Sequence, residues 1–207
     1  MQTKQILDTF SAIEQRRSIK LYDPNHKLSD EEEKTLMNLA LLSPTSFNIQ
    51  NWRFILVKDQ ELKNQICDAS WKQAQVKDCS LLIVVCADLK AAEKNPERYW
   101  KNAPENIQKI IVPMISQYYK GNETLSRDEA QRSCGIAAQT IMLAAKAMGY
   151  DTCPMVGFDP AKVGEIIKLP TDHLISMMIT VGKALQPARE RAGQLPYDEV
   201  VVVNRFS

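Results

Sequence analysis

The segment 81–87 constrains the fold more strongly than any other part of the chain. It reads Leu-Leu-Ile-Val-Val-Cys-Ala, so every position is apolar. The run is too short to span a membrane, and its β-branched content is typical of a strand. A strand that is apolar on both faces belongs to a sheet covered on both sides, whereas a half-exposed strand alternates between apolar and polar residues. We therefore expect segment 81–87 to be the central strand of a covered sheet.

The remaining patterns predict a mixture of helices and strands. Helical spacing or capping signals mark residues 4–15, 29–42, 59–76, 126–148 and 159–169, and apolar runs mark strands at 53–57, 174–181 and 199–203. Ser29 and Glu32 have the spacing of a capping box, Ser126 is the expected N-cap of the longest helix, and Gly149 is its expected end. The elements lack the regular alternation of a doubly wound fold, which favours the α+β class.

Residues 96–120 are expected to form a lid-like helical excursion from a single domain that spans residues 1–207. Their helical pattern is interrupted by Pro104 and Pro113. The segment is rich in aromatic side chains, among them Trp100, Tyr118 and Tyr119. No internal repeat or linker divides the sequence into further units.

Composition limits the class of partner and the cellular setting. The formal net charge of +1 lacks the positive excess of a nucleic-acid-binding protein. No apolar run reaches membrane-spanning length and the first residues do not resemble a secretory signal, so we expect a cytoplasmic protein that is not inserted in a membrane. The five cysteines form no Cys-x-x-Cys pair and are expected to be reduced thiols. A structural zinc site is not expected, because His26 and His173 lie far from any cysteine pair.

A basic cluster near the start of the chain is the first candidate for a ligand site. Arg16, Arg17, Ser18 and Lys20 follow an amphipathic segment and precede a turn. Guanidinium groups grip phosphate oxygens in two places and an ammonium adds a point charge, so the cluster suits a phosphate. Taken alone it is also compatible with a solvated basic stretch. Near the other end, the pair Arg189 and Arg191 could complete a site for a doubly charged phosphate, although on its own it is compatible with surface charge.

Two loops add polar groups that could contact a planar ligand. The segment 43–52, Ser-Pro-Thr-Ser-Phe-Asn-Ile-Gln-Asn-Trp, gathers hydroxyl and amide groups that can donate and accept at the edge of a heterocycle, or can form an ordinary polar turn. Its Trp52 is expected in the core rather than at a ligand. In the segment 149–160, Gly157 permits close backbone approach, and exposed N–H groups could face a ring. That segment is equally compatible with an ordinary connection between two helices.

Several common catalytic motifs are absent from the sequence. It contains no Gly-x-Gly-x-x-Gly after a strand, no phosphate-binding-loop lysine and no Gly-x-Ser-x-Gly elbow. With so few acid–base groups in suggestive contexts, an enzyme built on this chain would need a cofactor to carry the chemistry.

These four segments, in their order along the chain, resemble the pattern of the FMN-dependent nitroreductase family. That pattern has an early Arg-Arg-Ser-x-Lys, then Ser-Pro-Ser-Ser-x-Asn-x-Gln-Pro-Trp, then a Pro-x-x-Gly-Phe loop after a long helix, and a basic pair near the end. The likeness covers residues 12–203. It implies a three-layer α/β/α sandwich around a mainly antiparallel sheet, and an intertwined homodimer with FMN at each subunit interface. The small residues of helix 126–148 would then contact the second subunit: Gly135, Ala137, Ala138, Ala144 and Ala145.

The resemblance also assigns roles to the basic residues. Arg16 and Ser18 would hold the FMN phosphate and ribityl chain, with Arg189 and Arg191 closing on the phosphate. Arg17 would contribute contacts from its backbone and to the flavin edge. Lys20 would lie near the N1/O2 edge of the ring system, where a fixed cation stabilises the negative charge of the reduced flavin.

The remaining flavin contacts implied by the resemblance come from three segments. Those expected to frame the flavin from the other subunit are Pro44, Thr45, Ser46, Asn48 and Gln50. Those expected to pack over one ring face and donate backbone N–H groups toward N5 and O4 are Pro154, Met155, Val156 and Gly157. The polar side chains chosen from segment 71–76 are Gln73 and Gln75. Two positions depart from the family pattern, because Asn51 replaces the usual proline and Val156 stands where some members have glutamate.

The function implied by the resemblance is that of an FMN oxidoreductase. NADH or NADPH would deliver hydride to flavin N5, and a nitroaromatic, a quinone or another flavin would then take electrons in the same pocket, giving ping-pong kinetics. No side chain would act covalently, so we predict no catalytic residue beyond the electrostatic support of Lys20. The excursion 96–120 would set acceptor preference. The alternatives are a dehalogenase, an enoyl-type reductase or a flavin-fragmenting enzyme of the same fold, a non-catalytic FMN-binding dimer, and a flavin-free structural domain.

Overall fold

The computed structural model describes residues 6–206, which fold around one antiparallel sheet of four strands. The strands are β1 (Trp52–Val57), β2 (Leu81–Asp88), β3 (Asp151–Met155) and β4 (His173–Gly182), arranged in the order β1-β2-β4-β3 with antiparallel neighbours throughout. Every residue of β2 is buried, which confirms that segment 81–87 is a central strand. Helices interspersed irregularly with antiparallel strands confirm the α+β class.

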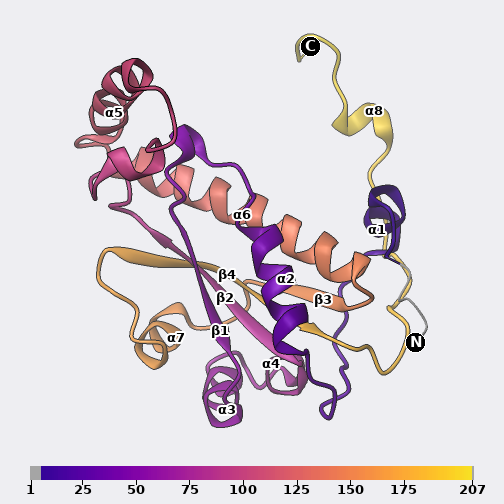
Figure 1. Ribbon diagram of the computed structural model, residues 1–207. Coiled ribbons are helices and arrows are strands. Elements are labelled where there is room, and N and C mark those ends of the chain that lie inside the picture. The colour runs from indigo at the N-terminus through magenta and orange to yellow at the C-terminus, as the bar shows by residue number, and fades with distance from the viewer. Residues whose placement is uncertain (1–5, 207) are drawn as a thin grey trace.

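Helices cover both faces of this sheet (Figure 1). On one side lie α2 (Asp30–Ala40) and α6 (Glu123–Ala147), and on the other lie α3 (Gln60–Asp68), α4 (Ala74–Asp78) and α7 (Pro160–Ile166). Side chains alternate along β2, so Leu81 and Ile83 enter the core beneath α6, while Leu82 and Val84 enter the core beneath α3 and α7. This alternation of two apolar sets is the physical origin of the three layers, and it explains why the strand has no polar face.

Several small residues of helix α6 pack against the sheet of the same chain. Ala137, Ala138 and Ala145 are buried in the core that α6 forms with the sheet. The expectation that these three alanines contact a second subunit is therefore wrong, because their methyl groups already fill the space above β2 and β4. Gly135 differs from them, since a Cβ atom built on it would meet no neighbouring atom within 4 Å.

Two helix boundaries differ from the sequence prediction. Helix α6 begins at Glu123, because Asn122 accepts a hydrogen bond from the backbone of Leu125 at 2.9 Å, and Ser126 is not its N-cap. The expected helix 59–76 is two helices, α3 and α4. The chain turns between them with left-handed backbone at Trp71 (φ 53°) and Lys72 (φ 56°), a conformation that interrupts a right-handed α-helix.

The strands at the margin of the sheet also differ from the prediction. Strand β3 is not among the strands expected from the sequence. It contains Pro154, which is tolerated because β3 is an edge strand. The expected strand 199–203 is wrong. Tyr197–Val200 forms a single helical turn, α8, and no strand of the described residues 6–206 pairs with the valines that follow it. A strand requires a hydrogen-bonding partner, and the tail leaves the body of the molecule (Figure 1).

Residues 96–120 protrude from the body at the end opposite the tail (Figure 1). They contain the short 3-10 helix η2 (Pro96–Tyr99) and helix α5 (Glu105–Tyr119). Pro104 precedes α5, whereas Pro113 lies inside it, so the expected interruption at Pro113 is wrong. The first helix of the chain, α1 (Thr9–Gln15), packs against α6. No helix within residues 6–206 is both long enough and apolar enough to cross a membrane.

Candidate functional site

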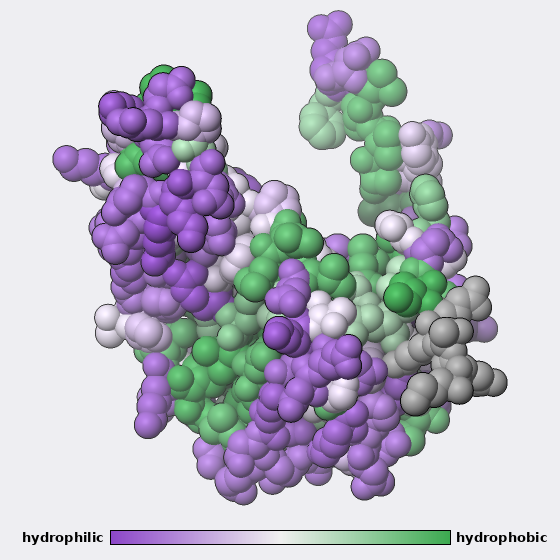
Figure 2. All heavy atoms as spheres, in the orientation of Figure 1, coloured by the Kyte–Doolittle hydropathy of each residue, from purple (hydrophilic) through white to green (hydrophobic). Residues whose placement is uncertain are grey.

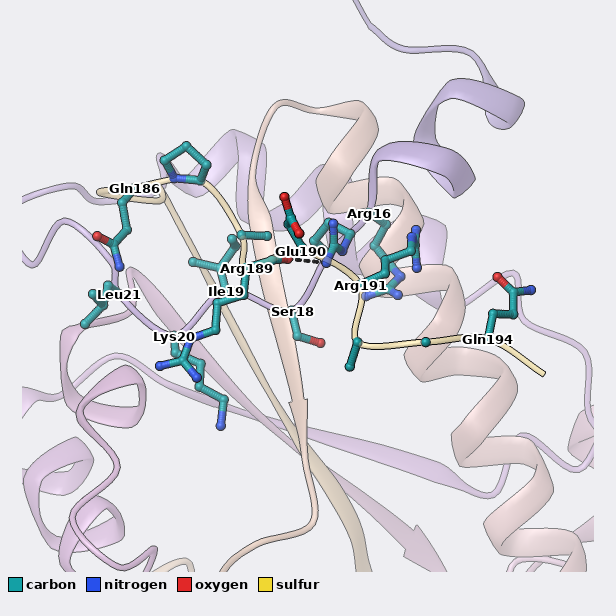
Figure 3. A pocket seen from close by; sticks show the side chains of 15 residues that line it. Arg16, Ser18, Ile19, Lys20, Leu21, Gln186, Arg189, Glu190, Arg191 and Gln194 are labelled. Atoms are coloured by element: carbon teal, nitrogen blue, oxygen red, sulfur yellow. Dashed lines mark hydrogen bonds between the residues drawn. The ribbon is translucent and has the colours of Figure 1, made fainter.

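A cavity of about 750 Å³ lies where a segment near the start of the chain meets one near its end (Figure 3). It is lined by residues 16–21 and 186–194. Five of these side chains are cationic, namely Arg16, Arg17, Lys20, Arg189 and Arg191, and one, Glu190, is acidic. The structure therefore brings together the basic cluster and the basic pair that lie more than 160 residues apart in the sequence. Such an excess of positive charge in a concave site attracts anions.

Backbone pairing with the sheet accounts for this convergence. Ser18 bridges Thr152 of β3 in parallel, and the Ile19 N–H donates to the Thr152 carbonyl at 3.0 Å. Leu185, just beyond β4, donates its N–H to the Leu21 carbonyl at 3.1 Å. The segment 18–22 thus lies between β3 and the chain that leaves β4. That chain continues into residues 186–191, so the basic pair Arg189 and Arg191 is brought beside the basic cluster.

Two guanidinium groups fasten the walls of the cavity to each other. Arg17 donates to the carbonyl of Arg189, and Arg191 Nη2 donates to the carbonyl of Glu14 at 3.2 Å. Arg16 lies beside Arg191 in Figure 3. Arg17 therefore has a cross-linking role in the fold, in addition to the flavin-edge contacts expected of it. Arg16, Ser18 and Lys20 alternate along an extended backbone, which places them on one side of it.

The positive charge of this segment reaches the edge strand. Burial raises the pKa of the Cys153 thiol, and the nearby Lys20 ammonium, the Ser18 hydroxyl and the Arg16 guanidinium act in the opposite direction. These influences place the basic cluster alongside β3.

The loop after β3 is held by an amide chain. Gln73 Nε2 donates to the carbonyl of Gly157 at 2.8 Å and to the carbonyl of Ser70 at 3.1 Å, and Gln75 Nε2 donates to Gln73 Oε1 at 3.0 Å. The two glutamines selected from the sequence thus fix the loop that carries Gly157, while the side chain of Val156 is 76% exposed. Of the neighbouring predicted residues, Met155 is buried and Pro154 is part of β3.

A tryptophan that the sequence reasoning did not select also contacts this loop. A Cβ atom built on Gly157 would lie 2.8 Å from Cζ3 of Trp71, so the indole occupies the space that a side chain at position 157 would need. Trp71 is 69% exposed. Its left-handed backbone costs about 1–2 kcal/mol for a residue other than glycine. No local sequence signal marks this residue, because the helical pattern expected for residues 59–76 continues through it.

The polar loop 44–50 lies apart from the basic cavity, and none of its residues lines that cavity. The Gln50 N–H donates to Thr45 Oγ1 at 2.9 Å, and Phe47, Asn48 and Gln50 have left-handed backbone. Pro44 and Asn48 are exposed, and Ser46 begins the 3-10 turn η1 (Ser46–Asn48). These residues therefore form a preorganised loop that could meet a ligand only from another direction. Trp52, after the loop, is 5% exposed, which confirms that it belongs to the core.

The excursion 96–120 braces this loop. Trp100 Nε1 donates to the Phe47 carbonyl at 2.9 Å, and Asn48 Nδ2 donates to the Tyr99 carbonyl at 2.9 Å. The Phe47 ring also packs against Tyr118 and Tyr119, with ring centroids 5.4 Å and 6.4 Å away. The indole of Trp100 is therefore engaged with the loop, whereas Tyr118 is still about half exposed.

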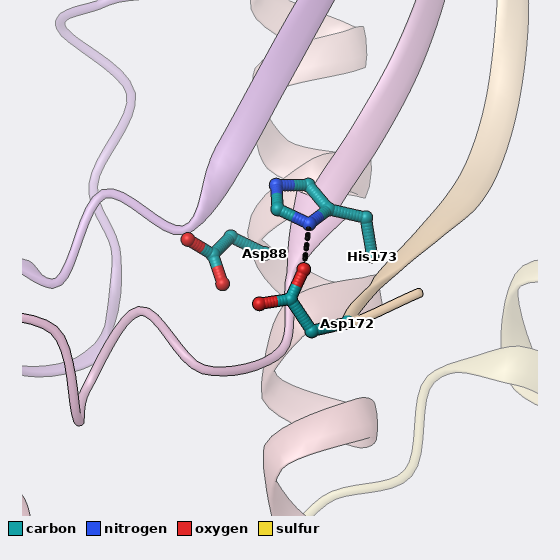
Figure 4. Close-up of side chains that lie close together, drawn as sticks. All are labelled: Asp88, Asp172 and His173. Carbon is teal, nitrogen blue, oxygen red and sulfur yellow. Dashed lines mark hydrogen bonds and ion pairs between the residues drawn. The ribbon is translucent and has the colours of Figure 1, made fainter. Parts of the chain in front are cut away.

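A second polar cluster, not foreseen from the sequence, lies at the end of β2 (Figure 4). The carboxylate of Asp88 is buried. Asp172 Oδ1 lies within hydrogen-bond distance of His173 Nδ1, at 2.6 Å. Lys94 Nζ lies 3.0 Å from both oxygens of Asp88 and 2.7 Å from Asp172, and Arg53 lies 3.2 Å from Asp88. These cations neutralise the carboxylates, so the cluster forms an ion-pair network.

The cysteines offer no nucleophile. All five are buried and free, in agreement with the expectation of reduced thiols. Burial raises the pKa values of Cys79, Cys86 and Cys134 to about 12, so these thiols stay protonated at neutral pH.

Comparison with known proteins gives a consistent match. The model of the Nitroreductase family matches residues 13–183. The chain is 48% identical over 204 residues to Protein DrgA of Synechocystis sp., covering 96% of this chain and 97% of the relative. It is 32% identical over 196 residues to an oxygen-insensitive NADPH nitroreductase of Helicobacter pylori, with coverage of 91% and 93%.

Solved structures share the fold. An NAD(P)H:FMN oxidoreductase assigned in Staphylococcus epidermidis superimposes with a TM-score of 0.90 at 29% identity, covering 98% of each chain. A protein of Exiguobacterium sibiricum assigned as a nitroreductase, solved in complex with FMN, superimposes with a TM-score of 0.88 at 30% identity, covering 95% of this chain and 97% of the other.

Proposed function

Because the chain belongs to the nitroreductase family of NAD(P)H-dependent flavin oxidoreductases, we propose that it holds FMN in the basic cavity and reduces nitroaromatic, quinone or similar electron-poor acceptors. The observation that carries the proposal is the convergence of Arg16, Ser18 and Arg191 on one cavity. Five cationic side chains and one carboxylate around a concave site favour an anionic ligand between the two segments.

The residues present fit the parts of FMN in order. Four guanidinium groups and the Ser18 hydroxyl suit a phosphate dianion, which Arg binds in two places at once. From Arg16 to Lys20 an extended chain spans at most about 14 Å, room for a sugar-like linker between phosphate and ring. Lys20 and residues 154–157 would then border the ring system. Polar groups at one end and an apolar strand edge at the other match a ligand that has a charged tail and a planar head.

The chain contributes position and electrostatics to the reaction. When bound, FMN would supply the capacity to take a hydride from NADH or NADPH and to pass electrons onward. Lys20 would bring a positive charge to the ring edge and would stabilise negative charge that develops there. The amide chain through Gln73 fixes the carbonyl of Gly157, and with it the direction of the loop N–H groups. No cysteine or histidine needs to act covalently.

The proposed assembly is a homodimer in which loop 44–50 frames the flavin held by the second copy. Exposed apolar side chains support it, and a monomer rarely leaves so many uncovered. They lie on α1, after α2, on α6 and in the tail, namely Phe10, Ile13, Leu42, Ile136, Val200, Val202, Val203 and Phe206. Figure 2 shows hydrophobic surface along the tail and between the tail and the raised excursion. A second copy seated there would cover this surface.

The dimer is tested by a charge placed in the exposed apolar surface. We expect Ile136→Glu to shift the molar mass measured by light scattering from dimer toward monomer and to reduce bound FMN. Lys162→Glu, on α7 at the other side of the sheet, introduces the same side chain and should change neither. A wild-type protein that is monomeric and still binds FMN would contradict the proposed assembly.

Acceptor preference is proposed to depend on the excursion 96–120. Tyr118 is the aromatic residue of the excursion with most surface available for an acceptor, because Trp100 is hydrogen bonded to loop 44–50 and Tyr119 is buried. Replacement of Tyr118 by Ala should change the ratio of kcat/KM between a nitroaromatic and a quinone. An unchanged ratio would assign the excursion a purely structural role.

The function itself is tested by a spectrum and an anaerobic titration. The purified protein, with FMN added if necessary, should show the flavin band at a stoichiometry of one FMN per chain, and NADH or NADPH should bleach it. Reoxidation by a nitroaromatic or a quinone would support the reductase. Bound flavin that is not bleached would indicate a non-catalytic FMN-binding dimer, and failure to bind FMN would indicate a flavin-free domain.

A further inference from the structure

We propose that Trp71 determines substrate specificity by forming an aromatic wall on which the planar ring of a substrate stacks beside the flavin. The guest is a flat, electron-poor ring, either the nicotinamide or an aromatic acceptor. The inference rests on the proposed function, because it needs FMN in the basic cavity with its ring toward residues 154–157.

The first observation is the way in which the chain presents this side chain. Trp71 is 69% exposed, whereas Trp52 is buried and Trp100 is hydrogen bonded to loop 44–50. The turn beneath Trp71 is closed by hydrogen bonds from the Lys72 N–H to the Cys67 carbonyl at 2.9 Å and from the Gln73 N–H to the Ser70 carbonyl at 3.2 Å. A large apolar side chain is therefore held out toward solvent by a rigid turn.

The second observation is where the indole lies. Its Cζ3 and Cε3 atoms lie 2.8 Å and 3.5 Å from the position of a Cβ atom on Gly157. Gln73 Nε2 is 3.3 Å from the same position and donates to the Gly157 carbonyl. One edge of the indole thus rests on the loop proposed to border the flavin. Val156, the residue before Gly157, is 76% exposed.

The chemistry of the side chain fits the guest. Indole has an electron-rich face, and aromatic rings prefer offset stacking with centroids about 4.5–7 Å apart. Nitroaromatics, quinones and oxidised nicotinamide are flat and electron-poor. Val156, where some family members have glutamate, leaves this border apolar, so stacking rather than charge is the interaction that the site offers here.

The experiment compares the FMN-loaded wild type with Trp71→Ala, Trp71→Phe and Lys72→Ala. Lys72 is the exposed neighbour with the same left-handed backbone, so its variant controls for damage to the turn. The kinetic readout is kcat/KM for 1,4-naphthoquinone and for ferricyanide, which has no aromatic ring. The binding readout, which needs no turnover, is the change in the flavin absorption spectrum on titration with NAD⁺.

We expect Trp71→Ala to lower the ratio of kcat/KM for naphthoquinone to kcat/KM for ferricyanide about tenfold, or to weaken NAD⁺ binding about tenfold. Trp71→Phe should recover most of the loss, and Lys72→Ala should stay within about twofold of wild type. A change in the quinone ratio alone identifies the acceptor as the stacked ring, and a change in NAD⁺ binding alone identifies the nicotinamide. If neither changes while FMN remains bound, the role of Trp71 is refuted and the proposed function stands. If the wild type binds no FMN, both are refuted.

Discussion

The contact between Gly157 and Trp71 leads to a prediction about protein stability that is independent of turnover. In Gly157→Ala, the new methyl group would stand 2.8 Å from Cζ3 of Trp71. Ordinary carbon–carbon contacts are about 3.5–4.0 Å, so the indole must retreat by about 1 Å. The amide nitrogen of Gln73, 3.3 Å from the same position, must also shift, although it is fixed by two hydrogen bonds.

The expected magnitude combines two opposing effects. Overpacking costs about 1–3 kcal/mol, and the exposure of the indole favours the lower end of that range. Gly157 does not have left-handed backbone, so alanine also restricts the unfolded chain and stabilises the protein by about 0.4–1 kcal/mol. In the wild-type background the two effects nearly cancel or leave a slight destabilisation. In a Trp71→Ala background the 2.8 Å contact is gone and only the smaller adjustment at Gln73 opposes the stabilising effect, so Gly157→Ala should be neutral or stabilising.

The assay is a double-mutant cycle on the free energy of unfolding, measured by urea denaturation of the four proteins without added FMN. The coupling free energy between positions 71 and 157 should be about 1–2 kcal/mol, and for a chain of this length each kcal/mol corresponds to about 2–4 °C in Tm. Additive effects, within about 0.5 kcal/mol, would refute the reasoning. They would mean that Trp71 does not rest on Gly157 in solution.

Three further predictions address other parts of the molecule. Arg191→Ala should weaken FMN binding about 10–100-fold by fluorescence titration, because a charged hydrogen bond is worth about 1.5–3 kcal/mol, while Lys101→Ala, on the distant excursion, should leave the affinity unchanged. Trp100→Phe removes the donor to the Phe47 carbonyl and should lower Tm by about 2–4 °C, and an unchanged Tm would show that the excursion does not brace the loop. Hydrogen bonds from the Lys94 ammonium and the His173 imidazole lower the pKa of Asp172 to about 2 from an ordinary 3.8. The contribution of Asp172 to stability is therefore present above about pH 4 and is lost as the pH falls toward 2. Asp172→Asn should remove that part of the acid dependence of urea unfolding, and an identical pH profile would exclude the ion pair.

The parts of the fold that were predictable are those with a strong local signal. Segment 81–87 is apolar at every position, and only a doubly covered strand accommodates that pattern. The Ser29 and Glu32 capping box forms as expected, with the Ser29 N–H donating to Glu32 Oε2 at 3.0 Å. The tail 199–203 has an equally strong β signal, yet it forms no strand, because β propensity describes a side chain that fits a sheet and cannot supply the hydrogen-bonding partner.

The features that were missed depend on contacts between distant segments. The turn at Trp71 carries no glycine or proline to mark it, so the helical pattern of residues 59–76 continues through it in the sequence. The ion-pair network joins Asp88 and Lys94 to Asp172, which is 84 residues beyond Asp88, and no local pattern records such a pairing. Its members are ordinary charged residues wherever they occur in a sequence.

The basic cavity shows why a site can be predicted when its geometry cannot. The arginines at both ends were selected by their chemistry, since clustered guanidinium groups suit a phosphate wherever they lie. Their convergence depends on two backbone pairings, Ile19 with Thr152 and Leu185 with Leu21, and neither contact has a side-chain signature. Thr152 could not be chosen as the partner because β3, a short edge strand that contains a proline, was not recognised as a strand. Because β3 was not predicted, Trp71 could not be selected either: the position of β3 brings the loop at Gly157 against the turn between α3 and α4. Side-chain chemistry therefore indicated what the cavity could bind, while the pairing of one weak strand decided which residues lie around that cavity.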